Sequence, residues 1–353
     1  MRRTETHLKI ILRQRLYYLI EVLIIFTGIF LFLLIPTMLL PFLINDKFLA
    51  FEPLYYLLRA VIILIAIPLS LYVATFAMEK QRKKLILEED ISPSRNFLSL
   101  FNITKKNFKF QLLYGVLLLF LIFIPLDFFT YLFSPGMLSY ASTVLVESSY
   151  NSYFMESYYV FLVSVIIIQI FVAIYEETLF RGFLANRGSD YLKKMPAVII
   201  TSFFFGLGHF SYIFVLPSID LPIIFPIIWF LQAFFIGIIL AMLVSRRHWI
   251  FPLIFAHAVN NIITAHSIWN FIHGNDFSLM SFFVYIPLLI ISILLFIWQF
   301  SRIKESLSIG YKEFKSYFAR DKSLEESSSD VIIRIMLDFL FGLIIFLIGI
   351  ILI

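Results

Sequence analysis

The sequence contains no cysteine and few charged residues, which make up 14% of its 353 positions. Without cysteine, the chain cannot form disulfide bridges, use a thiolate nucleophile or build a metal site from thiolates. A soluble domain carries about 25% charged residues, so the low charge content argues against a soluble globular protein. The chain is instead 61% hydrophobic and 18% aromatic. This composition predicts a membrane protein.

Long apolar runs recur along the whole chain, with short polar segments between them. A helix needs about 20 apolar residues to cross the hydrocarbon core of a bilayer, so each run predicts one transmembrane helix. We therefore predict an all-α fold, a polytopic transmembrane helix bundle of about nine spans. The predicted spans are residues 17–44, 54–78, 111–134, 156–180, 197–216, 221–244, 250–272, 279–300 and 331–353.

The Lys and Arg residues are distributed unevenly between the two ends of these spans. If the N-terminus is cytoplasmic, 25 of the 28 Lys and Arg residues fall in cytoplasmic segments, and the outer segment 135–155 contains none. Cytoplasmic loops of membrane proteins carry such an excess. We therefore predict a cytoplasmic N-terminus and a location in the cell (plasma) membrane. The basic residues that give the net charge of +5 lie in short loops, where they set the orientation of the protein in the membrane. No nucleic-acid partner is therefore expected.

Three groups of polar residues interrupt the apolar helices. They are Glu176, Glu177 and Arg181 in the fourth predicted span and just after it, His209 in the fifth, and His257 and Asn261 in the seventh. An ionisable residue inside hydrocarbon is costly and usually marks a functional site. Counted from the predicted inner helix ends, Glu176, His209 and His257 all lie between the inner interface and the bilayer midplane. A single polar cavity that opens to the cytoplasm is therefore predicted.

Each group also has a structural explanation. Glu177 and Arg181 are four residues apart, so they can form an ion pair on one face of the helix. A lone buried histidine such as His209 is more often a structural residue than a catalytic one. His257 and Asn261 could each make one hydrogen bond between helices, or together donate two hydrogen bonds to one developing oxyanion.

Other polar residues in the predicted spans are interpreted as structural. Arg334 and Asp338 are four residues apart in the last span and are expected to pair with each other. Asp127, Gln169 and Gln232 are isolated in the sequence, and no functional role is assigned to them.

Glutamate, histidine and asparagine together suit the hydrolysis of an amide bond. Glu176 has no obvious partner on its own helix, and a carboxylate with a histidine can activate water. Histidine and amide donors can stabilise the tetrahedral oxyanion. Alternatively, Glu176, His209 and His257 could hold a divalent metal ion such as zinc. The zinc-protease pattern HExxH is absent, and the residues alone leave metal-assisted and metal-free hydrolysis open.

Three short motifs resemble those of the CPBP (Abi) intramembrane proteases, a family of CAAX prenyl proteases and bacteriocin-processing proteins. EETLFRGF, from residue 176, resembles the family's EExxxR motif. FGLGH, residues 205–209, resembles FxxxH, and HAVNN, residues 257–261, resembles HxxxN. Order and spacing agree with the family over about residues 155–272.

The resemblance implies a role for each motif residue. Activation of the attacking water would fall to Glu176 and His209, oxyanion binding to His257 and Asn261, and support of the site to Glu177 and Arg181. Members of the family have been described both as metalloproteases and as glutamate proteases. The cofactor therefore stays open between a divalent metal such as zinc and none.

The resemblance further implies an intramembrane endopeptidase whose site faces the cytoplasm. Its partners would be membrane lipids and a membrane-bound peptide or protein substrate, with bacteriocin maturation or self-immunity as the role. A non-catalytic immunity or partner-binding protein, or a transporter, is the alternative. The sequence has no visible repeated halves, which argues against a transporter.

This interpretation divides the chain into three parts. Residues 151–275 would form the catalytic core. Residues 1–150 would supply N-terminal transmembrane helices, with a cytoplasmic or interfacial segment at 79–110. Residues 276–353 would supply C-terminal transmembrane helices, with a flexible cytoplasmic loop at 301–330.

Overall fold

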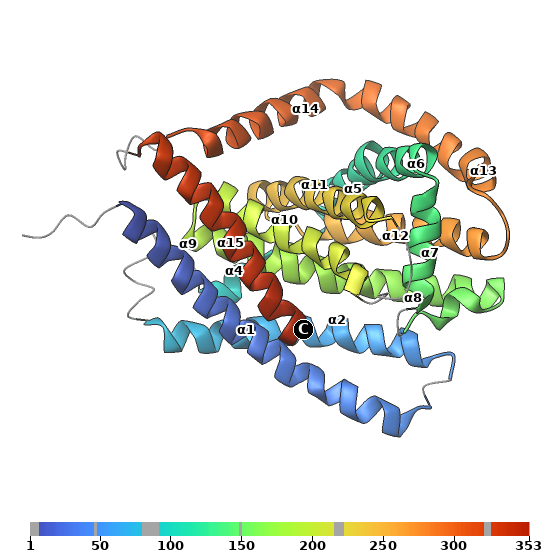
Figure 1. The fold of residues 1–353 in the computed structure, drawn as a ribbon, viewed down its shortest axis with the longest axis horizontal. Coiled ribbons are helices and arrows are strands. Elements are labelled where there is room, and N and C mark those ends of the chain that lie inside the picture. Colours follow the sequence, from blue (N-terminus) through green and yellow to red (C-terminus); the bar gives the residue numbers. More distant parts are fainter. Residues whose placement is uncertain are drawn as a thin grey trace, which may run out of the picture.

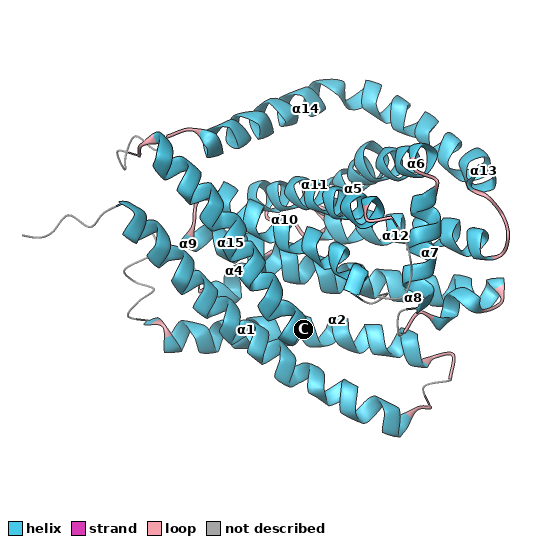
Figure 2. Cartoon of the chain, in the orientation of Figure 1, coloured by secondary structure: helices cyan, strands magenta, loops and turns pink. Residues whose placement is uncertain are grey.

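The computed structural model describes residues 7–45, 48–79, 92–147, 150–214, 222–320 and 326–352. Every regular element among them is a helix (Figure 2), which confirms the predicted all-α class. The elements are α1 (His7–Leu43), α2 (Phe51–Ala77), α4 (Pro93–Ser99), α5 (Phe108–Leu118), η1 (Leu119–Phe123), α6 (Ile124–Phe133), α7 (Gly136–Glu147), η2 (Ser152–Met155), α8 (Tyr158–Glu177), η3 (Thr178–Ala185), α9 (Asn186–Tyr191), α10 (Lys194–Phe210), η4 (Ser211–Phe214), α11 (Ile224–Arg247), α12 (Phe251–Ile272), α13 (Phe277–Met280), η5 (Ser281–Tyr285), α14 (Ile286–Phe318) and α15 (Ser328–Leu352).

Eight helices of the described residues are long and apolar enough to cross a membrane, and they correspond to eight of the nine predicted spans. The remaining prediction, residues 250–272, coincides with α12, a helix of 22 residues. The histidines and asparagines of α12 lower its mean hydropathy, and several of them belong to the site described below. The bundle therefore agrees with a polytopic fold of about nine spans.

The connections between the long helices gather at two opposite ends of the bundle (Figure 1). The start of α1 and the connections from α2 to α4 and from α14 to α15 lie at the left end. The connections from α1 to α2, from α6 to α7 and from α12 to α13 lie at the right end. The charge pattern assigns the first group to the cytoplasm and the second to the outside, so the bundle alternates as that topology requires.

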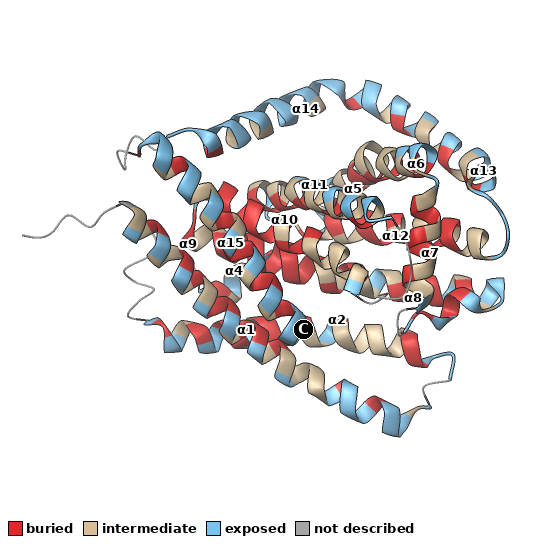
Figure 3. Ribbon diagram, in the orientation of Figure 1, coloured by how far each residue is buried: buried red, intermediate tan, exposed pale blue. Residues whose placement is uncertain are grey.

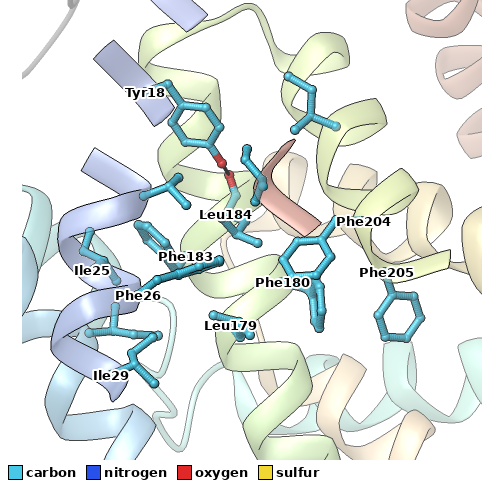
Figure 4. Packing of buried hydrophobic residues seen from close by; sticks show 14 of the residues in the cluster. Tyr18, Ile25, Phe26, Ile29, Leu179, Phe180, Phe183, Leu184, Phe204 and Phe205 are labelled. Atoms are coloured by element: carbon cyan, nitrogen blue, oxygen red, sulfur yellow. Dashed lines mark hydrogen bonds between the residues drawn. The ribbon is translucent and has the colours of Figure 1, made fainter. Parts of the chain in front are cut away.

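The most deeply buried part of the chain lies near the centre of the bundle, along η3, α9 and α10 (Figure 3). All eight residues of the π-helix between α8 and α9 are buried. Side chains of α1 pack in one cluster with this π-helix and with α10, and the Phe26 ring lies against Phe204 of α10 (Figure 4). The Tyr18 hydroxyl donates a hydrogen bond to the Leu184 carbonyl oxygen at 2.8 Å. Helix α1, from outside the expected catalytic core, thus supports the helix that carries the first motif.

Helices α10 and α11 pack closely at two glycines. A Cβ atom on Gly206 would lie 3.0 Å from the Phe230 ring, and one on Gly237 would lie 3.0 Å from the Ser202 Cβ atom. Small residues allow such close approach between membrane helices. The contact fixes α10, which carries His209, against its neighbour.

The prediction of a flexible loop at 301–330 is wrong for the first half of this segment, because α14 continues as one helix to Phe318. The segment 301–330 is polar enough in composition to suggest a loop. However, Tyr317 is buried near the end of the helix, and its hydroxyl donates to the Asp338 Oδ2 atom of α15 at 2.8 Å. This contact anchors the polar end of α14. Residues 321–325 of the predicted loop lie outside the described residues.

The expected pair of Arg334 and Asp338 is also wrong. Asp338 instead accepts hydrogen bonds from the guanidinium of Arg15 on α1, at 2.8 and 2.5 Å. Arg334 pairs with Glu326 at 2.9 Å. Arg15 and Asp338 are both buried, and a buried charge that lacks its partner is strongly destabilising. The ion pair between α1 and α15 therefore satisfies two charges that the sequence places more than 300 residues apart.

Of the segment 79–110, residues 79 and 92–110 are described, and residues 80–91 lie outside the described part of the chain. Within it, the short helix α4 buries Phe97 against the core, with Phe101 at 5.5 Å between ring centroids. The interfacial position of this segment stays a prediction.

Candidate active site

A cavity of about 290 Å³ lies between α8, α10 and α12, and α2, α6, α7 and α11 complete its walls. Four of the six predicted site residues line it, namely Glu176, His209, His257 and Asn261. They come from three helices that are distant in the sequence. The structure therefore brings these four side chains to one cavity, while the other two predicted residues lie buried beside it.

His257 is held between the two adjacent carboxylates of α8. Its Nδ1 atom lies 2.7 Å from Glu177 Oε1, and its Nε2 atom lies 3.7 Å from Glu176 Oε2. An ionised carboxylate only accepts hydrogen bonds, so the contact with Glu177 assigns a proton to Nδ1. The Nε2 atom then faces Glu176 and the cavity. The Phe123 ring stacks on His257 at 6.1 Å between centroids, which restricts the imidazole further.

The two glutamates occupy different environments because adjacent positions of a helix differ by about 100° in direction. The Glu177 side chain is fully buried, whereas 26% of the Glu176 side chain is exposed. Glu177 therefore orients His257 from behind, and Glu176 presents a carboxylate to the cavity. The sequence did not reveal the contact between Glu177 and His257, because no spacing rule links residues of different helices.

Glu177 also forms the ion pair that the sequence predicted. The Arg181 Nη1 atom donates to Glu177 Oε1 at 3.1 Å, which confirms the predicted pairing. The Arg181 guanidinium lies over the Phe205 ring, with Cζ 4.1 Å from the centroid. The helix changes to a π-helix from Thr178 to Ala185, directly after this glutamate, and such segments are frequent at functional sites. One carboxylate oxygen thus joins Arg181 to His257.

His209 is the last residue but one of α10. Its Nδ1 atom lies 3.0 Å from the Phe205 carbonyl oxygen. A carbonyl oxygen only accepts hydrogen bonds, so Nδ1 carries the proton and donates it to this oxygen, and Nε2 carries the lone pair. The Phe205 and Trp229 rings pack edge-on against the imidazole at 4.7 and 5.7 Å between centroids. These contacts fix the tautomer and the orientation of His209 in the cavity wall.

Asn261 is held by a glutamine that the sequence interpretation left without a role. Its Nδ2 atom donates to Gln169 Oε1 at 3.1 Å, and Gln169 Nε2 donates to the Tyr153 hydroxyl at 3.2 Å. The amide nitrogen of Asn261 carries two protons, and one of them is engaged in this way. Gln169 lines the cavity as well. The interpretation of Gln169 as an isolated residue is therefore wrong, because its partners lie on other elements of the chain.

Asp127 likewise belongs to the cavity wall. Its Oδ2 atom accepts hydrogen bonds from Asn260 Nδ2 at 3.1 Å and from the Thr264 hydroxyl at 2.5 Å, both on α12. The carboxylate is thereby bound to the helix that carries His257. The rule that singled out Glu176, an acid inside a predicted span, applies equally to Asp127 and would have identified it.

The cavity extends away from these residues toward α7 and the 3-10 turn Ser152–Met155. Met137, Ala141 and Tyr153 line that part, together with Tyr56 of α2. The charge pattern assigns the segment 135–155 to the outer side, whereas a cavity that opens to the cytoplasm was predicted. Access from the cytoplasm therefore stays a prediction.

The three metal candidates, Glu176, His209 and His257, all line this cavity in the described part of the chain. No group of three or more His, Asp or Glu side chains there is arranged to hold a metal ion. Glu176 and His257 approach each other, at 3.7 Å, and His209 donates a hydrogen bond from Nδ1 to the Phe205 carbonyl oxygen, which leaves its Nε2 atom free in the cavity wall. The cavity is thus lined by the Glu176 carboxylate and two imidazoles, and such a set suits hydrogen bonds to a water molecule.

Comparison with known families matches residues 158–263 to a family model described as Rce1-like, Type II CAAX prenyl endopeptidase Rce1-like. The matched segment contains all three motifs and all six predicted site residues. It confirms the resemblance drawn from those motifs. Comparisons with curated proteins and with solved structures found no match. Helices α1, α2, α14 and α15 lie outside the matched segment.

Proposed function

Because residues 158–263 match the Rce1-like type II CAAX prenyl endopeptidase family, we propose that this chain is an intramembrane endopeptidase. In this proposal it hydrolyses peptide bonds of membrane-associated peptides or proteins with water activated by glutamate and histidine. The observation that carries the proposal is the placement of His257 between Glu177 and Glu176 at the wall of a cavity.

Water activation is assigned to Glu176 and His209. Glu176 accepts the proton of a water molecule bound in the cavity, because its carboxylate is the one that reaches the cavity surface. His209 accepts a hydrogen bond from the same water through Nε2, since Nδ1 is committed to the Phe205 carbonyl. The proton then passes to the leaving amine when the tetrahedral intermediate collapses.

Stabilisation of the oxyanion is assigned to His257 and Asn261. A carboxylate that accepts the Nδ1 proton stabilises positive charge on an imidazole, so His257 with Glu177 behind it can donate from Nε2. Asn261 has a second amide proton that the contact with Gln169 leaves available. The two residues lie one turn apart on α12, so their donors can converge on one oxygen.

The substrate is proposed to be a membrane-bound peptide, with bacteriocin maturation or self-immunity as the role, and the site to face the cytoplasm. These points rest on the family resemblance and on the distribution of Lys and Arg.

Chelators are expected to leave the cleavage rate unchanged, because the proposed water activation uses the Glu176 and His209 side chains alone. The measurement is the initial rate at which purified protein cleaves a membrane-anchored peptide, with and without 1,10-phenanthroline, together with the metal content of the protein. Loss of cleavage with the chelator and its return on addition of zinc would contradict the metal-free mechanism.

Labelling of single cysteines is expected to place the two ends of the bundle on opposite sides of the membrane. The chain has no cysteine of its own, so each introduced cysteine is the sole target. Asn275→Cys lies in the exposed connection between α12 and α13, and Ser306→Cys lies on the exposed part of α14. A membrane-impermeant maleimide should label Asn275→Cys in intact cells and Ser306→Cys only after permeabilisation. The reverse result would place the N-terminus outside and overturn the proposed topology.

A further inference from the structure

Arg59 lines the same cavity as Glu176, although it comes from α2, outside the matched family segment. Its Cζ atom lies 4.1 Å from the centre of the Tyr175 ring. Tyr175 directly precedes Glu176 in the chain, and all three residues line the cavity. None of the roles assigned above uses this cation.

Arg59 differs from the other arginines that are held inside the described bundle. Those arginines have carboxylate partners, in the pairs Arg15–Asp338, Arg181–Glu177, Arg187–Glu21 and Arg334–Glu326. Within the described residues, no carboxylate lies within ion-pair distance of Arg59. The face of an aromatic ring compensates only part of the cost of a charge withdrawn from water. Ionisable residues in membrane-spanning helices are rare and mostly functional, and a cation that has no carboxylate partner suits an anionic ligand.

The nearest acid on α2 is already engaged elsewhere. Glu52 lies about two helical turns before Arg59, and its carboxylate accepts hydrogen bonds from the backbone N–H groups of Ser152 at 2.8 Å and Tyr153 at 3.3 Å. This contact ties α2 to the 3-10 turn that forms the cavity wall. It also holds the part of α2 that carries Arg59 against the cavity wall.

We propose that Arg59 binds a carboxylate of the peptide substrate and thereby positions the scissile bond at Glu176. This inference rests on the proposed endopeptidase function. Arginine presents a planar fork of donors that matches a carboxylate with two parallel hydrogen bonds. The carboxylate is either the free C-terminus of the peptide or an acidic side chain. The cavity volume of about 290 Å³ fits a short peptide segment. Its polar lining, to which Tyr56, Tyr212 and Arg59 belong, fits the polar groups of such a segment.

The test uses three N-terminally palmitoylated, fluorescently labelled hexapeptides of Ala, Leu and Val. One ends in a free carboxylate, one ends in a carboxamide, and one ends in a carboxamide and has a single internal Glu. Their affinities are measured by fluorescence anisotropy in detergent micelles for the wild-type chain, Arg59→Gln, Arg59→Lys and a control, Arg247→Gln. Arg247 is exposed, and its guanidinium donates to the Tyr114 hydroxyl away from the cavity.

The wild-type chain should bind one of the two carboxylate-bearing peptides about ten- to a hundredfold more tightly than the neutral peptide, the range for a hydrogen-bonded charge. Arg59→Gln should abolish this preference, Arg59→Lys should keep part of it, and Arg247→Gln should keep all of it. Preference for the first peptide identifies the C-terminus as the ligand, and preference for the third identifies an acidic side chain. Equal affinity of the wild-type chain for the three peptides, including no binding to any, would overturn the proposal.

Cleavage of the same peptides separates this inference from the proposed function. If the preference is present and depends on Arg59 but no peptide is cut, the carboxylate site stands and the peptidase assignment fails. If peptides are cut, Arg59→Gln should raise KM for the preferred peptide about ten- to a hundredfold and leave kcat unchanged. An unchanged KM would show that Arg59 does not bind the substrate.

Discussion

Replacing Glu176 by Gln is expected to lower the rate of peptide cleavage by about 10²–10⁴-fold, the usual contribution of a general acid or base. Glutamine keeps the shape of the side chain and its contact with the cavity, but it cannot accept the proton of the attacking water. The measurement is kcat for a membrane-anchored peptide with purified protein in detergent.

The control for this variant is Glu305→Gln, on the exposed part of α14, which should cleave at the wild-type rate. Thermal unfolding of Glu176→Gln should stay close to that of the wild-type chain, because the Glu176 side chain is 26% exposed and its contact with His257 is long, at 3.7 Å. Full cleavage by Glu176→Gln would remove this residue from the mechanism.

Replacing Glu177 by Gln is expected to affect both stability and activity, for separate reasons. The Arg181 guanidinium, which is 1% exposed, would lose its carboxylate, and breaking one side of a buried ion pair costs about 3–5 kcal/mol. The imidazole of His257 would lose the negative charge on its Nδ1 side, so cleavage should fall by about 10²–10⁴-fold. Unfolding temperature and kcat are the two measurements.

The double variant Glu177→Gln, Arg181→Met separates these two effects. Removal of both charges leaves no unpaired charge in the core, and such paired replacements are often neutral or stabilising. The unfolding temperature should therefore return toward the wild-type value while cleavage stays low. If cleavage returns together with stability, Glu177 supports the fold alone and does not position His257.

The helices were predictable from the sequence because hydrocarbon imposes length and apolar composition on each span. Helix ends were less predictable where a helix leaves the apolar region. The polar composition at the end of α14 predicts a loop, but this part is helical, and Tyr317 joins it to α15 by a hydrogen bond to Asp338. Similarly, α12 is less apolar than its neighbours because it supplies the polar residues of the cavity.

Contacts within one helix were partly predictable, and contacts between helices were not. The spacing of Glu177 and Arg181 predicted their ion pair correctly, whereas the same spacing failed for Arg334 and Asp338. In the second case Arg15, from the opposite end of the chain, lies against Asp338. The motifs identified which residues gather at the cavity, but not which atoms meet there.

For the same reason, the residues that other helices contribute to the cavity walls could not be predicted from the sequence. The partner of Gln169 is Asn261 of α12, and Arg59 of α2 lies against Tyr175 of α8. An isolated polar residue in a predicted span is therefore best regarded as one half of a contact whose other half lies on another helix.

The most direct test of the proposed activity is a comparison of peptide termini in membranes from cells that produce either the wild-type chain or Glu176→Gln at equal levels. Mass spectrometry of these membranes detects cleavage even when the substrate is unidentified. The proposal predicts new peptide termini that are present with the wild-type chain and absent with Glu176→Gln. Identical sets of termini in the two membranes would contradict it.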